Sequence, residues 1–300
     1  MKLQYFQGEQ PNFGDELNTW LWPQLLPGFL DDDPRILFIG IGSILGSHYD
    51  AGAKKVVFGA GYVPTYHQAP DVHGGDWDIF FVRGPRTARA LGLPDRLGIG
   101  DAAILLRALA VPFPREPRCV GFMPHWESLP RGNWRAACAL AGIRFIDPTA
   151  SVERVISEIL GCEVLIAEAM HGAIVADTLR VPWVPVLPID HAHREKWFDW
   201  ADALSLEFAQ HRLWPSSPAE VAHATRYRPF LSRIAAGLTC PPVSRLASPF
   251  ITYAAAQRLS ALAKQAPCMS ADRVIGTVLE QMLEKLSRLE RAYRTPVSRA

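Results

Sequence analysis

The sequence predicts an α/β protein with two Rossmann-like domains and a helical C-terminal segment. The chain has 300 residues, enough for two domains of ordinary size. Hydrophobic residues make up 49% and charged residues 20% of the chain, which excludes intrinsic disorder. Short apolar runs alternate with helix-like stretches in two successive sets. This order is typical of right-handed βαβ crossovers, so we expect two parallel sheets.

The first set of elements occupies the first hundred residues. Its apolar runs are rich in aliphatic and aromatic residues and end at glycine or arginine. Helix 85–91 begins with a proline, which is favoured at the first helical position. The run AAILLRALA after Asp101 predicts a short helix or a buried segment. The expected strands are Ile36–Ile39, Lys55–Phe58 and Asp78–Val82, and the expected helices are Asp15–Leu25 and Pro85–Leu91.

A proline-rich segment separates the two sets. VPFPREPR (111–118) has three prolines in eight residues and is the strongest linker signal in the chain. We therefore predict domains at 1–112 and 113–215, followed by a helical tail at 216–300. The strands expected in the second set are Arg118–Phe122, Ile143–Ile146, Val164–Ala167 and Trp183–Val186. The expected helices are Asn133–Ala141, Ser151–Leu160, His171–Leu179 and Arg194–Leu204.

The tail ends in an amphipathic stretch. Apolar residues recur from Val274 to Leu289 with a period near 3.6, and Arg288, Arg291, Arg294 and Arg299 lie at its end. We expect this helix to pack back on the domains. The alternative is a basic helix that touches anionic lipid headgroups at the inner membrane face.

Composition narrows the classes of function. The chain has 31 lysines and arginines and 30 aspartates and glutamates, so its net charge is only +1. It therefore lacks the overall positive potential that attracts nucleic acid, and any anionic ligand must be bound by a local cluster of basic residues. The five cysteines form no CxxC pair, which favours reduced thiols. We find neither a signal peptide nor an apolar run near the ~20 residues of a membrane span, and expect a soluble, cytoplasmic protein.

Two polar motifs in the first half are candidates for substrate binding. Asn12 and Asp15 lie just before a predicted helix, so they either cap it, the expected role of Asp15, or hydrogen-bond a hydroxylated acceptor. Gly42 and Ser43 belong to a glycine-rich turn after a strand, where backbone N–H groups can approach an anion. This turn lacks the third glycine of a dinucleotide fingerprint, because position 45 is leucine.

Three cations are candidates for binding an anionic ligand. Arg83 comes at the end of a predicted strand, where its guanidinium either points into a ligand crevice or forms a surface ion pair. Arg86 lies on the following helix and is expected to be solvated unless it contacts the ligand. Lys196 can offer a point charge to phosphate.

His171 stands where a predicted strand meets a helix, in the sequence EAMHGA. Histidine is the side chain best suited to proton transfer near neutral pH, and Glu168 lies three residues earlier, where it can orient the ring. The sequence DHAH at 190–193 suggests a metal site. No third ligand is evident in the sequence, so we expect a polar loop there and no metal.

Together the motifs resemble the polysaccharide pyruvyl transferase family, most closely its exopolysaccharide, succinoglycan-type members. In chain order, the matching pieces are NFGDELN (12–18), GIGS (40–43), VRGPRTARALG (82–92), GIGDAAILL (98–106), EAMHGAIVADTLRVPWVPV (168–186) and HREKWFDW (193–200).

The resemblance implies a glycosyltransferase-B-like arrangement of the two domains. It implies phosphoenolpyruvate as the donor, no cofactor, and a pyruvate ketal formed on a sugar of a lipid-linked or polymeric acceptor. It assigns proton transfer to His171 and donor binding to Arg83. Many relatives have Arg-Leu before the histidine where this chain has Ala169-Met170, so Arg83, Arg86 or Lys196 must supply that charge.

Two other classes of function stay open. A nucleotide-sugar glycosyltransferase of the same fold needs a carboxylate for the donor ribose, and Glu163 or Glu168 offers one. A non-catalytic sugar-binding component would keep the fold without using His171.

Overall fold

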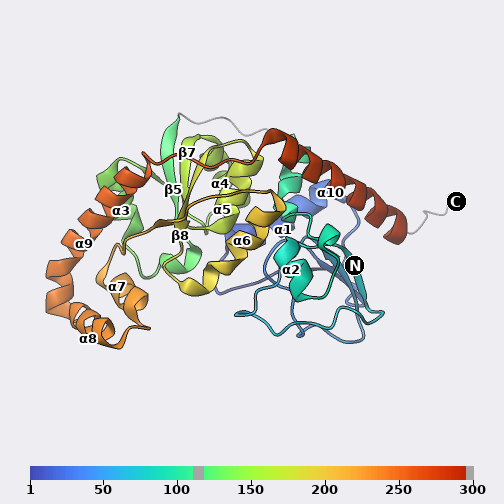
Figure 1. Cartoon of the computed structure of the whole chain (residues 1–300), viewed down its shortest axis with the longest axis horizontal. Coiled ribbons are helices and arrows are strands. Elements are labelled where there is room, and N and C mark those ends of the chain that lie inside the picture. The colour runs from blue at the N-terminus through green and yellow to red at the C-terminus, as the bar shows by residue number, and fades with distance from the viewer. Residues whose placement is uncertain (111–117, 295–300) are drawn as a thin grey trace. The chain divides into compact units, whose positions relative to one another are not determined.

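The computed structural model describes residues 1–110 and 118–294 (Figure 1). The chain forms two compact units. The first comprises Met1–Pro112, Glu195–Glu207 and Ser270–Ala300, and the second comprises Phe113–Arg194 and Phe208–Met269. The units therefore share the predicted helical tail between them, whereas the predicted domain limits assigned it to a separate segment. Nearly all of the predicted linker, residues 111–117, lies outside the described residues.

The first unit contains a four-stranded parallel sheet in the order β1-β2-β3-β4. Its strands are β1 (Lys2–Gln4), β2 (Ile36–Ile39), β3 (Lys54–Phe58) and β4 (Trp77–Phe81). Its helices are α1 (Phe13–Leu25), α2 (Pro85–Ala90), α6 (Glu195–Ala203) and α10 (Asp272–Tyr293), with the 3₁₀ helices η1 (Asp95–Leu97) and η2 (Ala102–Ala108). Trp22 of α1 packs edge-on against Phe38 at 4.8 Å and Phe58 at 5.6 Å between ring centroids, which fixes α1 on the sheet.

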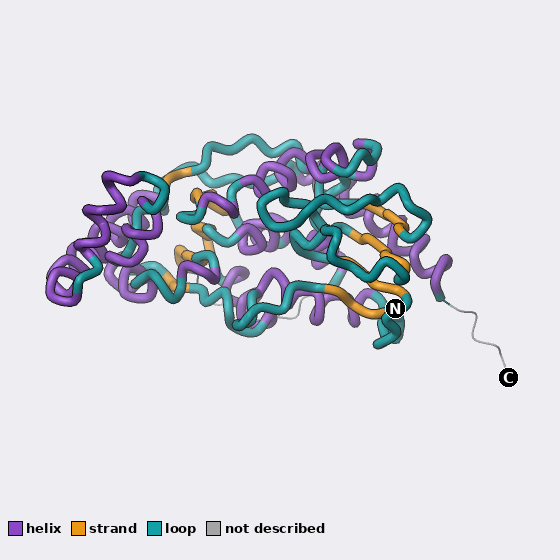
Figure 2. Tube along the Cα trace, turned by 90° about the horizontal axis from the view of Figure 1, so that it is seen from below, coloured by secondary structure: helices purple, strands orange, loops and turns teal. Residues whose placement is uncertain are grey.

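The second unit contains a five-stranded parallel sheet in the order β6-β5-β7-β8-β9, separate from the first (orange in Figure 2). Its strands are β5 (Cys119–Met123), β6 (Arg144–Phe145), β7 (Cys162–Ala167), β8 (Trp183–Leu187) and β9 (His211–Arg212). Its helices are α3 (Trp134–Ala141), α4 (Val152–Leu160), α5 (Met170–Thr178), α7 (Pro218–Thr225), α8 (Pro229–Leu238) and α9 (Pro241–Leu262), with η3 (Trp126–Ser128) and η4 (His191–His193).

The predicted α/β class with parallel sheets is confirmed, and each expected strand and helix agrees with the structure to within two residues at either end. The run after Asp101 is the 3₁₀ helix η2, whose first five residues are buried. The sequence analysis gave no residue range for β1 or β9, which span only three and two residues.

Helix α10 buries its apolar stripe against other elements of the first unit. Ile275, Val278, Met282, Leu286 and Leu289 are buried, and the helix packs on η2 and β4. Near its end the Tyr293 hydroxyl donates to Asp78 Oδ2 at 2.7 Å. The stripe is therefore not available to a lipid surface, while Arg299 lies outside the described residues. In the described part of the chain, no helix has the length and apolarity to cross a membrane.

Candidate functional site

The first polar cluster lies in the first unit, where α1 begins beside the turn after β2. Asn12 is the N-cap of α1 and accepts from the Gly14 N–H at 3.4 Å, so the helix cap is Asn12, whereas Asp15 was expected to have this role. The Asn12 amide donates to Asp15 Oδ2 at 2.6 Å. Asp15 Oδ1 faces Gly42, where an added Cβ would lie 3.4 Å from it. The structure thus brings these three predicted residues together.

Asn18 holds this cluster in place, and the sequence analysis missed it. Its buried amide donates to the Asp15 and Ile41 carbonyls at 3.0 and 2.9 Å. Its Oδ1 accepts from Ile41 N–H and Trp22 Nε1, both at 2.9 Å. One side chain therefore satisfies the backbone of the turn after β2 and fastens it to α1.

Arg83, at the end of β4, is completely buried rather than part of a surface ion pair. Its Nε donates to Asp199 Oδ2 at 3.1 Å and its Nη1 donates to Ser43 Oγ at 2.6 Å. Gly61 makes room for the guanidinium, since a Cβ there would lie 2.2 Å from Arg83 Cζ. Nη2 is buried and has no hydrogen-bond partner among the described residues. The arrangement leaves one donor of a fixed cation unsatisfied next to Ser43.

Asp199 of α6 also caps α2, whose N-cap residue Gly84 has no side chain. The carboxylate accepts from the Arg86 and Thr87 N–H groups at 3.0 Å each and from Thr87 Oγ1 at 2.6 Å. The Arg86 side chain is exposed, as expected, and pairs with Asp202 at 2.7 Å. Lys196 lies half-buried on α6 in the same unit.

The second polar cluster lies in the second unit, at the carboxyl ends of β5, β7 and β8. Glu168 follows β7 and is fully buried. Its carboxylate accepts from His125 N–H at 2.8 Å, Ile189 N–H at 3.0 Å and Ser128 Oγ at 3.1 Å. Burial raises the pKa of Glu168, while these hydrogen bonds and the nearby Arg131 charge oppose the rise. Glu168 therefore joins the segments that follow the three strands, whereas it was predicted to orient His171.

His171 is the second residue of α5 and is half-buried. It lies two residues beyond Ala169, the N-cap of this helix, so the ring stands near the end of β7 as predicted from the strand-to-helix junction. Ligands of parallel α/β sheets bind at this edge.

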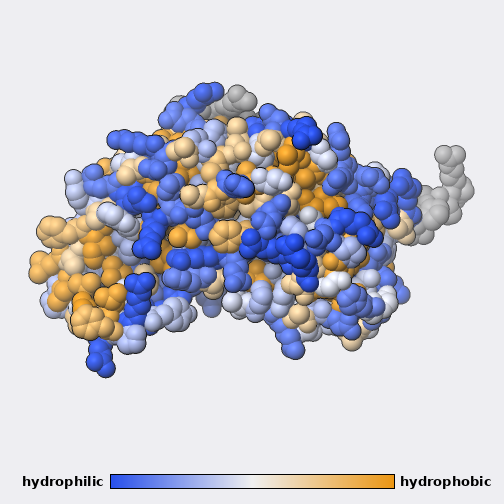
Figure 3. Space-filling model, viewed as in Figure 1, coloured by the Kyte–Doolittle hydropathy of each residue, from blue (hydrophilic) through white to orange (hydrophobic). Residues whose placement is uncertain are grey.

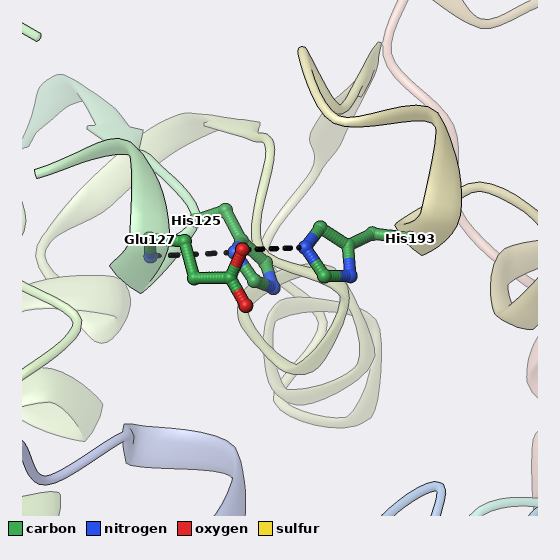
Figure 4. Close-up of side chains that lie close together, drawn as sticks. All are labelled: His125, Glu127 and His193. Carbon is green, nitrogen blue, oxygen red and sulfur yellow. Dashed lines mark hydrogen bonds and ion pairs between the residues drawn. The ribbon is translucent and has the colours of Figure 1, made fainter. Parts of the chain in front are cut away.

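Three side chains that can transfer protons or ligate a metal meet at the same edge (Figure 4). His193 Nε2 lies 3.0 Å from Glu127 Oε2, and the His125 and His193 rings stack at 4.0 Å between centroids. The hydrogen bond with His193 lowers the pKa of Glu127. The ligating atoms of the three lie within 4.8 Å of one another, so small movements would let two imidazoles and a carboxylate hold a divalent cation. The sequence analysis missed His125 and Glu127, although PHWES directly follows a predicted strand.

Cations lie beside this cluster. The Arg131 Nε is buried and has no hydrogen-bond partner within residues 1–110 and 118–294. Arg194 donates to the Pro188 carbonyl from Nε at 3.0 Å and from Nη2 at 2.9 Å. Burial alone would raise the pKa of Asp190, but the hydrogen bond from the Ala192 N–H and the Arg226 charge lower it to about 2. The edge therefore combines imidazoles with fixed charges of both signs.

Glu220 of α7 is a second buried carboxylate in this unit. It accepts from Trp134 Nε1 and from the Ser216 N–H, both at 2.8 Å. Burial, reinforced by the charge of Glu168, raises the pKa of Glu220 to about 7. This carboxyl group therefore titrates near neutral pH.

Comparison with known proteins decides the family. The family model for polysaccharide pyruvyl transferase matches residues 12–191. The chain belongs to the polysaccharide pyruvyl transferase family. The match runs from Asn12 to the loop after β8, and it includes Arg83, Glu168 and His171. Lys196 lies beyond it.

One curated relative agrees with this assignment. The succinoglycan biosynthesis protein ExoV of Rhizobium meliloti (strain 1021) is 40% identical over 225 residues, which cover 73% of this chain and 70% of that protein. No solved structure matches the chain. The family assignment therefore rests on sequence, and the roles of single residues rest on the geometry above.

Proposed function

We propose that this family member transfers pyruvate from phosphoenolpyruvate to a sugar of an exopolysaccharide precursor and forms a ketal. The observation that carries the proposal is the place of His171 within the family match, at the carboxyl edge of a parallel sheet. The ExoV relative, named for succinoglycan biosynthesis, supports a polysaccharide or oligosaccharide acceptor.

The reaction requires one acid/base group and fixed cations. Protonation of the methylene carbon makes C2 of the donor electrophilic, and one sugar hydroxyl adds to C2 and loses its proton. The C2–O bond to phosphate then breaks, the second hydroxyl closes the ketal and loses its proton, and inorganic phosphate leaves. We assign the proton transfers to His171, because imidazole serves as both acid and base near neutral pH.

The donor carries a carboxylate and a phosphate, so the site needs positive charge. Arg83 and Arg86 already pair with Asp199 and Asp202. We therefore propose that Arg131 supplies the positive charge that many relatives place at the position of Ala169. The charge of its guanidinium lowers the pKa of Glu168, which lies at the same edge of the sheet as His171. The assignment of Arg83 and Lys196, both in the first unit, as donor ligands stays a prediction from the sequence.

The acceptor is proposed to be a lipid-linked or polymeric saccharide on the cytoplasmic side of the membrane. Its hydroxyls would be held by the first cluster, Asn12, Asp15 and Gly42, and by the adjacent Ser43. Because phosphoenolpyruvate brings its own leaving group, the proposed reaction requires no resident cofactor. Loss of activity in EDTA and its recovery with one divalent metal would overturn this last point and implicate His125, Glu127 and His193.

The test is to incubate the protein with phosphoenolpyruvate and extracted saccharide acceptors. Released phosphate and the mass increment of a pyruvate ketal are then measured. His171→Ala should lower the rate by roughly 10²–10⁴. The matched control His73→Ala, an exposed histidine of the first unit, should not change it. Retention of more than about a tenth of the activity in His171→Ala, at unchanged melting temperature, would remove His171 from this role.

The rival functions give different results. Consumption of a nucleotide sugar in place of phosphoenolpyruvate would indicate a glycosyltransferase. Saccharide binding without turnover of either donor would indicate a binding component.

A further inference from the structure

Helices α8 and α9 of the second unit present an exposed apolar surface. The surface comprises Tyr227, Phe230, Ile234, Leu246, Phe250 and Tyr253, which we call the hairpin face. Phe230, Leu246 and Phe250 are 75, 74 and 77% exposed. Figure 3 shows hydrophobic surface gathered over the two helices. Large apolar side chains grouped in this way mark an interaction site.

Helix α9 is apolar on two opposite sides. One side buries Ala255, Leu259 and Leu262 in the core of the second unit, where the helix packs on α3. The other side carries Leu246, Phe250 and Tyr253 at spacings of four and three residues, which places them on one face of a helix. The core is complete without this second side, so folding of the unit does not account for its composition.

The charged side chains of the segment that carries the hairpin face are all basic. Residues 221–271 contain five arginines and one lysine but no aspartate or glutamate. Arg228, Arg233 and Arg245 on these helices are exposed. Apolar residues interspersed with arginine are typical of helices that lie in the interface of an anionic bilayer.

A second copy of the chain fits this surface poorly. A two-fold dimer would place the same patch on both subunits and so bring these arginines together with no carboxylate from the segment to pair with them. An anionic lipid surface offers phosphates for the arginines and an acyl boundary for the aromatic side chains.

We propose that the hairpin face of α8 and α9 binds the interfacial region of an anionic lipid bilayer. The apolar side chains enter the headgroup–acyl boundary and the flanking arginines contact lipid phosphates. This is surface attachment, in agreement with the lack of a membrane-spanning helix in the described residues. The contact differs from the one considered for the C-terminal arginines, because the apolar stripe of α10 is buried. The proposal does not depend on the donor or the acceptor.

The test is vesicle flotation of the full chain with phosphatidylcholine alone and with phosphatidylcholine plus phosphatidylglycerol. We expect binding to the mixed vesicles only, with release at high salt. Leu246→Glu with Phe250→Glu should lower the partition coefficient more than tenfold. The matched control Leu140→Glu changes a 60% exposed leucine of α3 outside the hairpin face and should leave binding intact.

The arginines are tested separately. Arg228→Gln and Arg233→Gln should each lower binding to the anionic vesicles about fivefold, the effect of one basic charge near such a surface. The control Arg154→Gln changes an exposed arginine of α4 and should have no effect. Melting temperatures and sedimentation velocity are recorded for every variant.

The outcomes distinguish a lipid bilayer from a second copy of the chain as the partner of the hairpin face. Failure of the wild-type protein to float with the anionic vesicles at low salt overturns the proposal. Equal binding of the Leu246→Glu, Phe250→Glu protein also overturns it. A wild-type dimer that this double variant dissociates, with no vesicle binding by either protein, would assign the hairpin face to a second copy of the chain.

Discussion

Replacing Asp199 with alanine should strongly destabilise the first unit. The change removes the partner of Arg83, whose side chain is 0% exposed, and leaves a buried guanidinium whose remaining side-chain partner among the described residues is Ser43. It also removes the acceptor for the first-turn N–H groups of α2, which its N-cap Gly84 cannot replace. Both losses come from one carboxylate, so they add in a single variant.

The structure sets the magnitude. Removing one partner of a buried ion pair costs about 3–5 kcal/mol, and losing a helix cap costs about 1 kcal/mol. We therefore expect the free energy of unfolding to fall by about 4–6 kcal/mol. Asp202, three residues later on α6, supplies the control. Its ion pair with Arg86 is exposed, with side-chain exposures of 50% for the arginine and 36% for the aspartate, so Asp202→Ala should cost less than about 1 kcal/mol.

Urea unfolding followed by circular dichroism and tryptophan fluorescence measures both variants. Should Asp199→Ala fail to fold, Arg83→Met in the same chain should restore folding, because it removes the buried unpaired charge. Losses for Asp199→Ala and Asp202→Ala within about 1 kcal/mol of each other would refute the reasoning. Arg83 would then be a cation free to serve a ligand.

Three further predictions concern stability. Glu220 has its pKa raised from about 4.5 to about 7, so the folded state binds the extra proton and stability should fall by about 3 kcal/mol as pH rises through this window. Urea unfolding at pH 5 and pH 8 should show a steeper decline in the wild type than in Glu220→Gln, which keeps the contribution of Glu168; equal slopes would contradict the assignment. Asn18→Ala leaves the buried hydrogen-bonding partners of this side chain unsatisfied and should lower the free energy of unfolding by at least about 2 kcal/mol in the same assay. A loss below about 0.5 kcal/mol would show that other contacts hold the turn after β2. Gly61→Ala should cost about 1–3 kcal/mol because its Cβ meets the fixed guanidinium of Arg83. Gly74→Ala, with no atom within 4 Å, is its control, and equal midpoints would show that the guanidinium can move.

The sequence determined most of the alternating strands and helices in both units, with limits within two residues of those in the structure. Patterns such as ILFI (36–39) and VLIA (164–167) are short apolar runs bounded by turns, and local periodicity and glycine placement are properties of the chain itself. For the same reason the sequence located His171 at the junction between a strand and a helix, because that position depends only on neighbouring residues. The family resemblance, carried by motifs in order along the chain, is confirmed.

Partners that are distant in sequence were decided only by the tertiary structure. Arg83 and Asp199 are 116 residues apart, and Glu127 and His193 are 66 apart. No local pattern encodes such a pairing, because it depends on which strand ends become neighbours after the crossovers form. The sequence could therefore place an arginine at a strand end. Only the packing of α6 against α2 decided that Arg83 is buried and paired. Only the edge shared by β5, β7 and β8 brought His193 next to His125 and Glu127, which can bind a metal or exchange a proton.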